Sequence, residues 1–167
     1  MKPGKIRPLA ICVFRRGDHI LVAEGYDTAR QQTFYRPLGG RIEFGERAAA
    51  TVARELREEI GQEVRDLRYL GALENIFTYE GQAGHEIVLV FDGAFVDEGV
   101  YGRDAILGTE AEDAQQPLFT AYWKPLAFFR GGAAPLYPDG LLTLLEMDAG
   151  QTHQTHLMVR SDPKKLE

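Results

Sequence analysis

The sequence predicts an α+β domain whose helices and strands form α/β/α layers. Extended segments predominate, one firm helix lies inside the chain, and a second helix lies near its end. The 167 residues suffice for one ordinary domain that buries a substantial core. Hydrophobic residues make up 44% and charged residues 26%, values typical of globular proteins that argue against disorder along the whole chain.

Short apolar runs bounded by turn residues predict the strands. Residues 6–14 are rich in Ile, Val and Phe and form the first strand. Arg16-Gly17-Asp18 is a turn signal, so residues 19–23 are expected to return as the second strand of a hairpin. The further expected strands are residues 34–36, 64–79, 86–91 and 121–124.

Two segments predict helices. Residues 46–60 contain no glycine or proline and many good helix formers, and Gly61 follows where a helix commonly ends. Asp139 is the expected cap of a second helix over residues 140–147. Between these helices, residues 97–117 are rich in glycine and acidic residues and predict a long loop.

Charge and cysteine content limit the function classes. The net charge of −6 argues against a protein that coats nucleic acid, although a metal ion and a few arginines can still hold a small phosphorylated ligand. The single cysteine, Cys12, lies in an apolar run and predicts a buried thiol in a reducing compartment. The N-terminal apolar stretch is too short to span a membrane and lacks a cleavage-site pattern, so we expect a cytoplasmic protein.

Glu55, Glu58 and Glu59 share one narrow face of the predicted central helix. At about 100° per residue they fall within an arc of about 100°. Three like charges on such an arc repel one another, and a bound hard cation such as Mg²⁺ explains their presence. The alternative is a solvated face on which Arg54 pairs with Glu58. The adjacent face, expected to pack on the domain, is apolar: Ala49, Val52, Ala53, Leu56 and Ile60.

The complete spacing of this segment resembles the Nudix box of the Nudix hydrolase superfamily. The matching residues are Gly40, Glu46 and, after seven intervening residues, Arg54-Glu55-Leu56-Arg57-Glu58-Glu59-Ile60-Gly61. All fixed positions of the family pattern match, as does the aliphatic Leu56. Gln62 stands where a last aliphatic residue is usual, and Pro37-Leu38, rather than proline alone, precedes the glycine pair.

The resemblance implies a Nudix pyrophosphohydrolase, which acts on acid anhydrides in phosphorus-containing substrates. It implies an α/β/α sandwich with a mixed central sheet, here over residues 1–148, and leaves residues 149–167 as a polar C-terminal tail. By the same resemblance, Glu55, Glu58 and Glu59 are catalytic and hold Mg²⁺, or Mn²⁺ as a substitute, with help from the Gly40 carbonyl. Arg54 is expected to pair with Glu46 and so to fix the helix on its loop.

The general base and the substrate contacts stay open at this point. Glu55 is the first candidate for the base. Its rivals are Glu86, at the start of a strong strand, and the loop acids Glu110, Glu112 and Asp113. The candidates for substrate binding are Arg36, Arg41 and Glu86. The candidates for stacking on a base are Phe34, Tyr35, Phe77, Tyr79 and Tyr101.

We expect a small nucleotide as the partner, with no nucleic acid and no membrane, and a homodimer as one option. The substrate class is a nucleoside diphosphate linked to another group, which includes dinucleoside polyphosphates, nucleoside diphosphate sugars, ADP-ribose and oxidised nucleoside triphosphates. A non-catalytic nucleotide-binding regulator on the same fold is the alternative function, but such a protein is expected to have lost box carboxylates. An isomerase on a related scaffold is expected to carry an extra catalytic cysteine, a role that the apolar setting of Cys12 disfavours.

Overall fold

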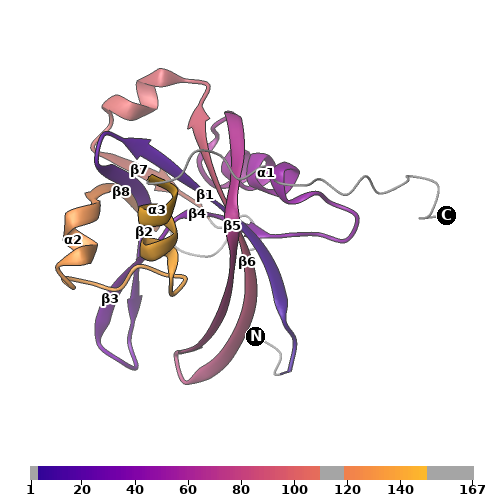
Figure 1. Cartoon of the computed structure of the whole chain (residues 1–167), viewed down its shortest axis with the longest axis vertical. Coiled ribbons are helices and arrows are strands. Elements are labelled where there is room, and N and C mark those ends of the chain that lie inside the picture. The colour runs from indigo at the N-terminus through magenta and orange to yellow at the C-terminus, as the bar shows by residue number, and fades with distance from the viewer. Residues whose placement is uncertain (1–3, 110–118, 150–167) are drawn as a thin grey trace.

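Helices cover both faces of one mixed sheet (Figure 1). The computed structural model describes residues 4–109 and 119–149. The strands are β1 (Arg7–Arg16), β2 (His19–Asp27), β3 (Gln32–Arg36), β4 (Leu38–Arg41), β5 (Val64–Tyr79), β6 (Gln82–Phe95), β7 (Ala105–Gly108) and β8 (Phe119–Pro125). The helices are α1 (Ala48–Ile60), the short 3₁₀ helix η1 (Glu98–Gly102), α2 (Leu126–Arg130) and α3 (Leu141–Ala149).

The sheet consists of two halves that are joined only near one turn. Its strand order is β5-β6-β1-β2-β8-β7, with β4 paired to β1 and β3 paired to β2. β1 and β6 run parallel, and the other paired strands run antiparallel. β1 and β2 pair only at Arg15 with Ile20 and at Arg16 with His19. Beyond these pairs the two halves diverge, as the course of their strands in Figure 1 shows.

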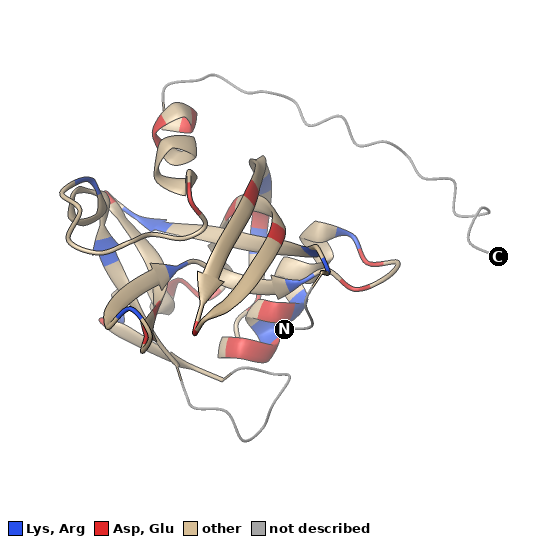
Figure 2. Cartoon of the chain, turned by 90° about the horizontal axis from the view of Figure 1, so that it is seen from below, with Lys and Arg blue, Asp and Glu red and all other residues tan. Residues whose placement is uncertain are grey.

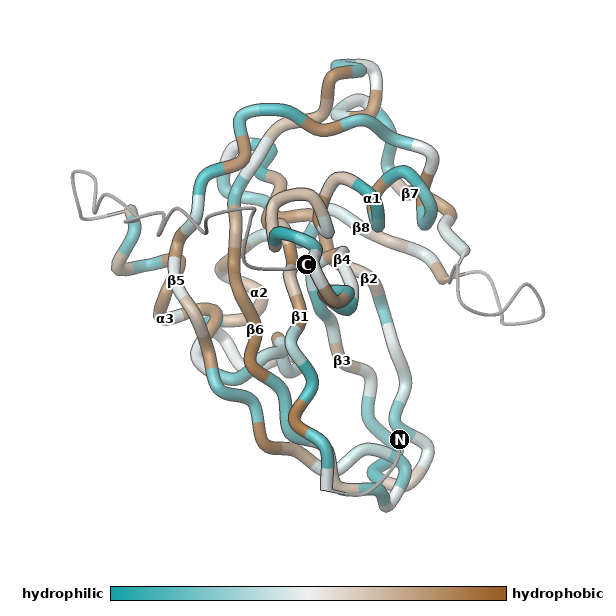
Figure 3. Tube along the Cα trace, turned by 90° about the vertical axis from the view of Figure 1, so that its right-hand side faces the viewer, coloured by the Kyte–Doolittle hydropathy of each residue, from teal (hydrophilic) through white to brown (hydrophobic). Residues whose placement is uncertain are grey.

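Alternation along β1 builds the two cores of the sandwich. Ala10, Cys12 and Phe14 are fully buried in the cluster that contains Val52 and Leu56 of α1. The residues between them face the opposite cluster, because successive side chains of a strand point to opposite faces. That second cluster joins β1 and β6 to α2 and α3 through Ile11, Val13, Val88, Val90, Phe129, Leu141 and Leu145. Figure 3 shows how hydrophobic the middle of β6 is.

Most predicted elements are present, although the limits of several differ from those predicted. The predicted central helix begins at Ala48 rather than at residue 46, and it ends at Ile60. Gly61 adopts the left-handed conformation, with φ of 67°, and its N–H donates to the carbonyl of Arg57. Cys12 is buried as expected, and this burial, with a smaller effect of the Asp92 charge, raises the pKa of its thiol well above the usual value.

Three sequence predictions require correction. Residues 97–117 are not one long loop, because η1 and β7 lie within them; Asp97 accepts a hydrogen bond from the Gly99 N–H, and Val100 is buried. Ala49 is exposed, whereas Thr51 is buried on the packed face of α1. Ala149, the first residue of the expected tail, is the last residue of α3.

The loop acids Glu110, Glu112 and Asp113 lie outside the described residues, as do residues 150–167 of the predicted tail. Among the described helices, none is long and apolar enough to cross a membrane.

Gly61→Ala tests the left-handed end of α1. A Cβ at Gly61 meets open space, so the cost arises from the backbone conformation alone. We expect the free energy of unfolding to fall by about 1–2 kcal/mol in urea titrations. Gly102→Ala is the control, because that position is equally open and its φ lies outside the left-handed region. Equal stability of the two variants would contradict the assignment of this helix end.

Candidate active site

The Arg54 guanidinium ties α1 to the loop that precedes it. Its Nε lies 2.9 Å from Glu46 Oε1 and its Nη2 lies 3.0 Å from Glu46 Oε2, which makes the pair bidentate. Nη2 also donates to the carbonyl of Arg41, at 3.0 Å. The predicted Arg54–Glu46 salt bridge is therefore confirmed. The resulting cluster of charges raises the pKa of Arg54 further above its usual value.

The same guanidinium also contacts two of the box carboxylates. Arg54 Nη1 lies 2.8 Å from Glu55 Oε1 and 3.0 Å from Glu58 Oε2. The pairing with Glu58, which the sequence offered as an alternative, thus coexists with the pairing to Glu46. Figure 2 shows acidic and basic residues side by side along α1. The positive charge of Arg54 therefore offsets the repulsion among the glutamates that it contacts.

Glu46 accepts hydrogen bonds from three directions. Besides Arg54, the Thr51 hydroxyl donates to Glu46 Oε2 at 2.7 Å and the Glu43 N–H donates to it at 3.2 Å. Hydrogen bonding from Arg54, followed by that from Thr51 and Glu43, outweighs the opposing effect of burial and lowers the pKa of Glu46 to about 2. Glu46 is therefore ionised at any pH at which the domain is expected to work.

Two consecutive glycines let β4 pass close to its neighbours. A Cβ at Gly40 would lie 2.3 Å from Cδ of Glu55, so only glycine leaves room for that carboxylate. A Cβ at Gly39, whose φ is 136°, would lie 2.2 Å from the Ala10 carbonyl oxygen of β1. The Gly40 backbone and the Glu55 side chain are consequently held against each other.

The three box carboxylates differ in exposure. Glu55 and Glu59 are half-buried, whereas Glu58 is exposed. Glu59 Oε2 is shielded from solvent, and the Glu59 carbonyl accepts a hydrogen bond from the Thr109 N–H at 2.8 Å. Within residues 4–109 and 119–149, no three Asp, Glu, His or Cys side chains converge into a coordination shell. The three carboxylates nevertheless offer oxygen atoms as ligands, and oxygen ligands suit Mg²⁺.

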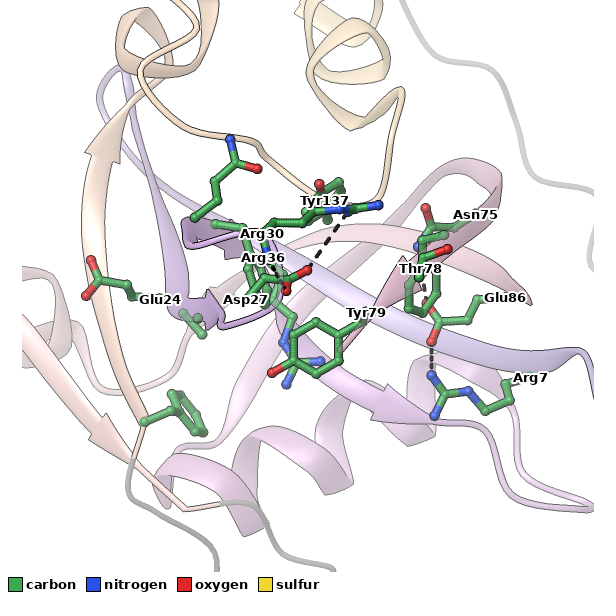
Figure 4. A pocket seen from close by; sticks show the side chains of 16 residues that line it. Arg7, Glu24, Asp27, Arg30, Arg36, Asn75, Thr78, Tyr79, Glu86 and Tyr137 are labelled. Carbon is green, nitrogen blue, oxygen red and sulfur yellow. Dashed lines mark hydrogen bonds and ion pairs between the residues drawn. The ribbon is translucent and has the colours of Figure 1, made fainter. Parts of the chain in front are cut away.

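A pocket of about 560 Å³ contains two of the three predicted substrate-binding residues. Arg36, at the end of β3, and Glu86, of β6, line it, whereas Arg41 does not. In Figure 4, Asp27, Arg36 and Tyr137 lie on one side of Tyr79, and Glu86 and its neighbours lie on the other. The lining comes from both halves of the sheet, so the opening between them forms the pocket.

Glu86 is bound on two sides. It is 7% exposed, forms an ion pair with Arg7, and accepts a hydrogen bond from Asn75 Nδ2 at 3.3 Å. Both neighbours line the pocket, and sequence reasoning missed both of them. Arg7 and Asn75 are the register partners of Glu86 on β1 and β5, and no local sequence signal reveals such a register.

Asp27 is a further pocket residue that the sequence did not indicate. It is 5% exposed, and its Oδ1 accepts a hydrogen bond from the Arg30 N–H at 3.0 Å. It ends β2 directly before the turn to β3. A carboxylate so placed is a buried acceptor at the pocket wall.

The predicted aromatic residues separate into two groups. Phe34, Phe77 and Tyr79 line the pocket, whereas Tyr35 and Tyr101 are structural. The Tyr35 hydroxyl donates to Glu24 at 2.7 Å, and burial, followed by this hydrogen bond, raises the pKa of Tyr35 to about 12. The Tyr101 hydroxyl accepts the Phe95 N–H at 3.0 Å. The structure adds two aromatic lining residues, Phe119 and Tyr137.

The pocket and the carboxylate face lie near each other along β3 and β4. Arg36 lines the pocket, and Gly40, four residues later, contacts Glu55. Four extended residues span at most about 14 Å. One elongated ligand can therefore reach both places.

A family model described as the NUDIX domain matches residues 5–129. The chain belongs to the Nudix family. The NAD-capped RNA hydrolase NudC of Pseudomonas aeruginosa is 32% identical to this Nudix chain over 115 residues, which are 66% of the chain and 36% of that protein. The protein of the same name from Mycobacterium tuberculosis is 42% identical over 69 residues, 41% of the chain and 21% of that protein. The chain thus spans about a third or less of the length of these relatives.

Solved structures support the Nudix fold. The NUDIX hydrolase from Nitrosomonas europaea superposes with a TM-score of 0.65 at 17% identity, covering 95% of this chain and 99% of that one. An ADP compounds hydrolase superposes with a TM-score of 0.52 at 20% identity, covering 90% of this chain and 76% of that one. At these identities the likeness shows the fold alone. The predicted α/β/α sandwich with a mixed sheet is confirmed.

Arg54→Ala tests the cluster that joins loop and helix. The substitution leaves the half-buried Glu46 without its guanidinium, so we expect a loss of about 1–3 kcal/mol in the free energy of unfolding at pH 7. Because the folded pKa of Glu46 is about 2, its contribution is fully present above the ordinary value near 4.5 and is lost as pH falls towards 2. The stability of Arg54→Ala should therefore depend less on pH between these limits. If the free energy of unfolding depends on pH in the same way in parent and variant, the Arg54–Glu46 pair does not stabilise the fold as proposed.

Proposed function

We propose that residues 1–148 form a metal-dependent Nudix hydrolase that cleaves the pyrophosphate bond of a nucleoside diphosphate linked to another group. The observation that carries this proposal is the close approach of the Gly40 backbone to the Glu55 carboxylate. That approach brings the β4 backbone against α1, the helix that also carries Glu58 and Glu59. The retention of all three carboxylates favours an enzyme over a nucleotide-binding regulator.

Glu55, Glu58, Glu59 and the Gly40 carbonyl are proposed to hold Mg²⁺, for which Mn²⁺ can substitute. A divalent cation bound there supplies charge neutralisation of the pyrophosphate oxygens and acidifies a water molecule. Arg54 already contacts Glu55 and Glu58, so its guanidinium holds these side chains in place on the helix. Because Glu46 binds the other edge of the same guanidinium, the loop is held in a fixed position relative to α1.

The chain's own groups are proposed to move the proton and to hold the phosphates. Glu55 accepts the proton of the attacking water, since its carboxylate is held against β4. Glu86 is the weaker candidate, because it lines the pocket rather than the carboxylate face of α1. Arg36 and Arg41 are proposed to donate hydrogen bonds to phosphate oxygens.

The choice of substrate requires a direct assay. Relatives of this chain carry the name NAD-capped RNA hydrolase, which adds an NAD-capped RNA to the nucleotides worth testing. The decisive panel contains nucleoside diphosphate derivatives and that RNA, each incubated with Mg²⁺ or Mn²⁺, with products identified by mass. Release of two phosphate-bearing products supports the proposal, and cleavage outside the pyrophosphate in every case would reject it.

Glu55→Gln and Glu59→Gln test the carboxylate face. Each substitution keeps the size of the side chain but removes a charge, so we expect kcat to fall by orders of magnitude while circular dichroism stays unchanged. Glu98→Gln is the control, because Glu98 is an exposed glutamate of η1 remote in sequence from the box. Near-parental turnover of both box variants would remove these residues from the active site.

Gly40→Ala tests the approach of β4 to the helix. The added methyl group collides with the Glu55 carboxylate, which must leave its present position. Mg²⁺ should raise the melting temperature of the parent, because a ligand that binds the folded state stabilises it. We expect this rise to be much smaller in Gly40→Ala, as measured by calorimetry with and without Mg²⁺. An equal rise in both proteins would place the cation elsewhere.

A further inference from the structure

The tips of two hairpins, one from each half of the sheet, meet at one glutamate. Glu80, in the turn between β5 and β6, accepts a hydrogen bond from the Thr28 N–H at 2.9 Å and a second from the Thr28 hydroxyl at 2.5 Å. Thr28 lies in the turn between β2 and β3, and 52 positions separate the two residues. Figure 1 and Figure 3 both show these hairpin tips at the lower end of the molecule.

The backbone at Glu80 is poorly suited to a glutamate. Tyr79 pairs with Gln82, so Glu80 and Gly81 form a two-residue hairpin turn. Their φ angles are 50° and 74°, and the turn type with positive φ at both positions favours asparagine, aspartate or glycine at the first. A longer side chain is strained in this left-handed conformation. Asparagine and aspartate are one methylene shorter than glutamate, so the contact with Thr28 gives a physical reason for the longer side chain.

This contact lies at the rim of the pocket. Thr28 directly follows Asp27 and Glu80 directly follows Tyr79, and both of these neighbours line the pocket. Among the described strands, β1 and β2 join the two half-sheets only at the opposite end of β2, beside His19. The opening between the half-sheets is therefore closed at one end by paired strands and at the other by the contact between Glu80 and Thr28.

The contact at the rim is weaker than the contacts within the pocket wall. Glu80 and Thr28 are both exposed, so water competes for each hydrogen bond, and such surface contacts contribute little net stability. By contrast, the buried Glu86 of the pocket wall is bound by both Arg7 and Asn75. The wall is therefore firmly held, whereas the contact between the hairpin tips can open and close in thermal motion.

We propose that the Glu80–Thr28 contact is a clasp, which opens to admit the substrate to the pocket and closes again behind it. The inference rests on the proposed function for the identity of that substrate. Glu80 and Thr28 are not among the residues that line the pocket, so the clasp controls the rates of entry and exit rather than the affinity. Because both passages require the open state, loss of the clasp accelerates association and dissociation by the same factor.

Amide exchange tests the clasp in the free protein. Because the Thr28 N–H donates to Glu80, its hydrogen exchange, followed by NMR, should be slowed in the parent. Glu80→Asn suits the turn but shortens the side chain, so exchange at Thr28 should become roughly two- to fivefold faster. Gln31→Asn is the matched control, because Gln31 also has a left-handed φ, of 51°, in the turn that contains Thr28 but takes no part in the clasp. Equal exchange at Thr28 in the parent and in Glu80→Asn would overturn the inference.

Stopped-flow binding of ADP-ribose to the metal-free protein tests control of entry and exit. The variants are Glu80→Asn and Thr28→Val, which loses the hydroxyl donor and so removes the second hydrogen bond independently. In both, the association and dissociation rates should rise roughly two- to fivefold, while Kd changes by less than about twofold. Gln31→Asn should bind ADP-ribose as the parent does.

The outcomes separate this inference from the proposed function. Unchanged rates in both clasp variants, or a faster dissociation alone with a higher Kd, would overturn the clasp. If the parent hydrolyses ADP-ribose with Mg²⁺ but the clasp variants bind it at parental rates, the proposed function stands and only the clasp fails. If the rates change as expected but no nucleoside diphosphate derivative is hydrolysed, the clasp stands and the proposed function fails. A parent that binds no ADP-ribose would overturn the clasp as a control of substrate entry.

Discussion

The active-site face depends on one guanidinium group surrounded by carboxylates. Arg54 binds Glu46 with two nitrogens and contacts Glu55 and Glu58 with a third. Without this cation, the acidic residues of α1 would repel one another, and the loop before the helix would lose its main attachment. The planar, five-donor geometry of arginine suits this role, since lysine could not form the same bidentate pair. Two of the candidate metal ligands, Glu55 and Glu58, thus contact a permanent positive charge.

Glycine acts in two ways around the pocket and the carboxylate face of α1. At Gly39 and Gly40 the absence of a side chain lets β4 approach β1 and the Glu55 carboxylate, so backbone is brought next to charge. At Gly25 and Gly84 it leaves room for the rings of Phe34 and Phe77, which form pocket walls. In both cases the missing Cβ creates the space that another group occupies, and the conformational freedom of glycine is secondary except at Gly39, whose φ is positive.

The divergence of the two half-sheets brings these features together. β1 and β2 stay paired only beside their turn, so β4 pairs with one of them and β3 with the other. The short connection at Pro37 joins β3, which ends at the pocket, to β4, which leads into the Nudix box. The pocket and the carboxylate face of α1 are consequently close along the chain, which passes from one to the other within a few residues.

The sequence by itself determined the Nudix box, the helix that ends at Gly61, the hairpin at Gly17 and the candidate carboxylates, since spacing and local periodicity encode all of these. It did not reveal η1 and β7, because their short segments resemble a glycine-rich loop. Only the tertiary structure assembled Arg7, Asn75 and Glu86, as well as the glycine–phenylalanine pairs. The physical reason is that strand register and the packing of distant segments decide such contacts, and neither is written in any local stretch of the chain.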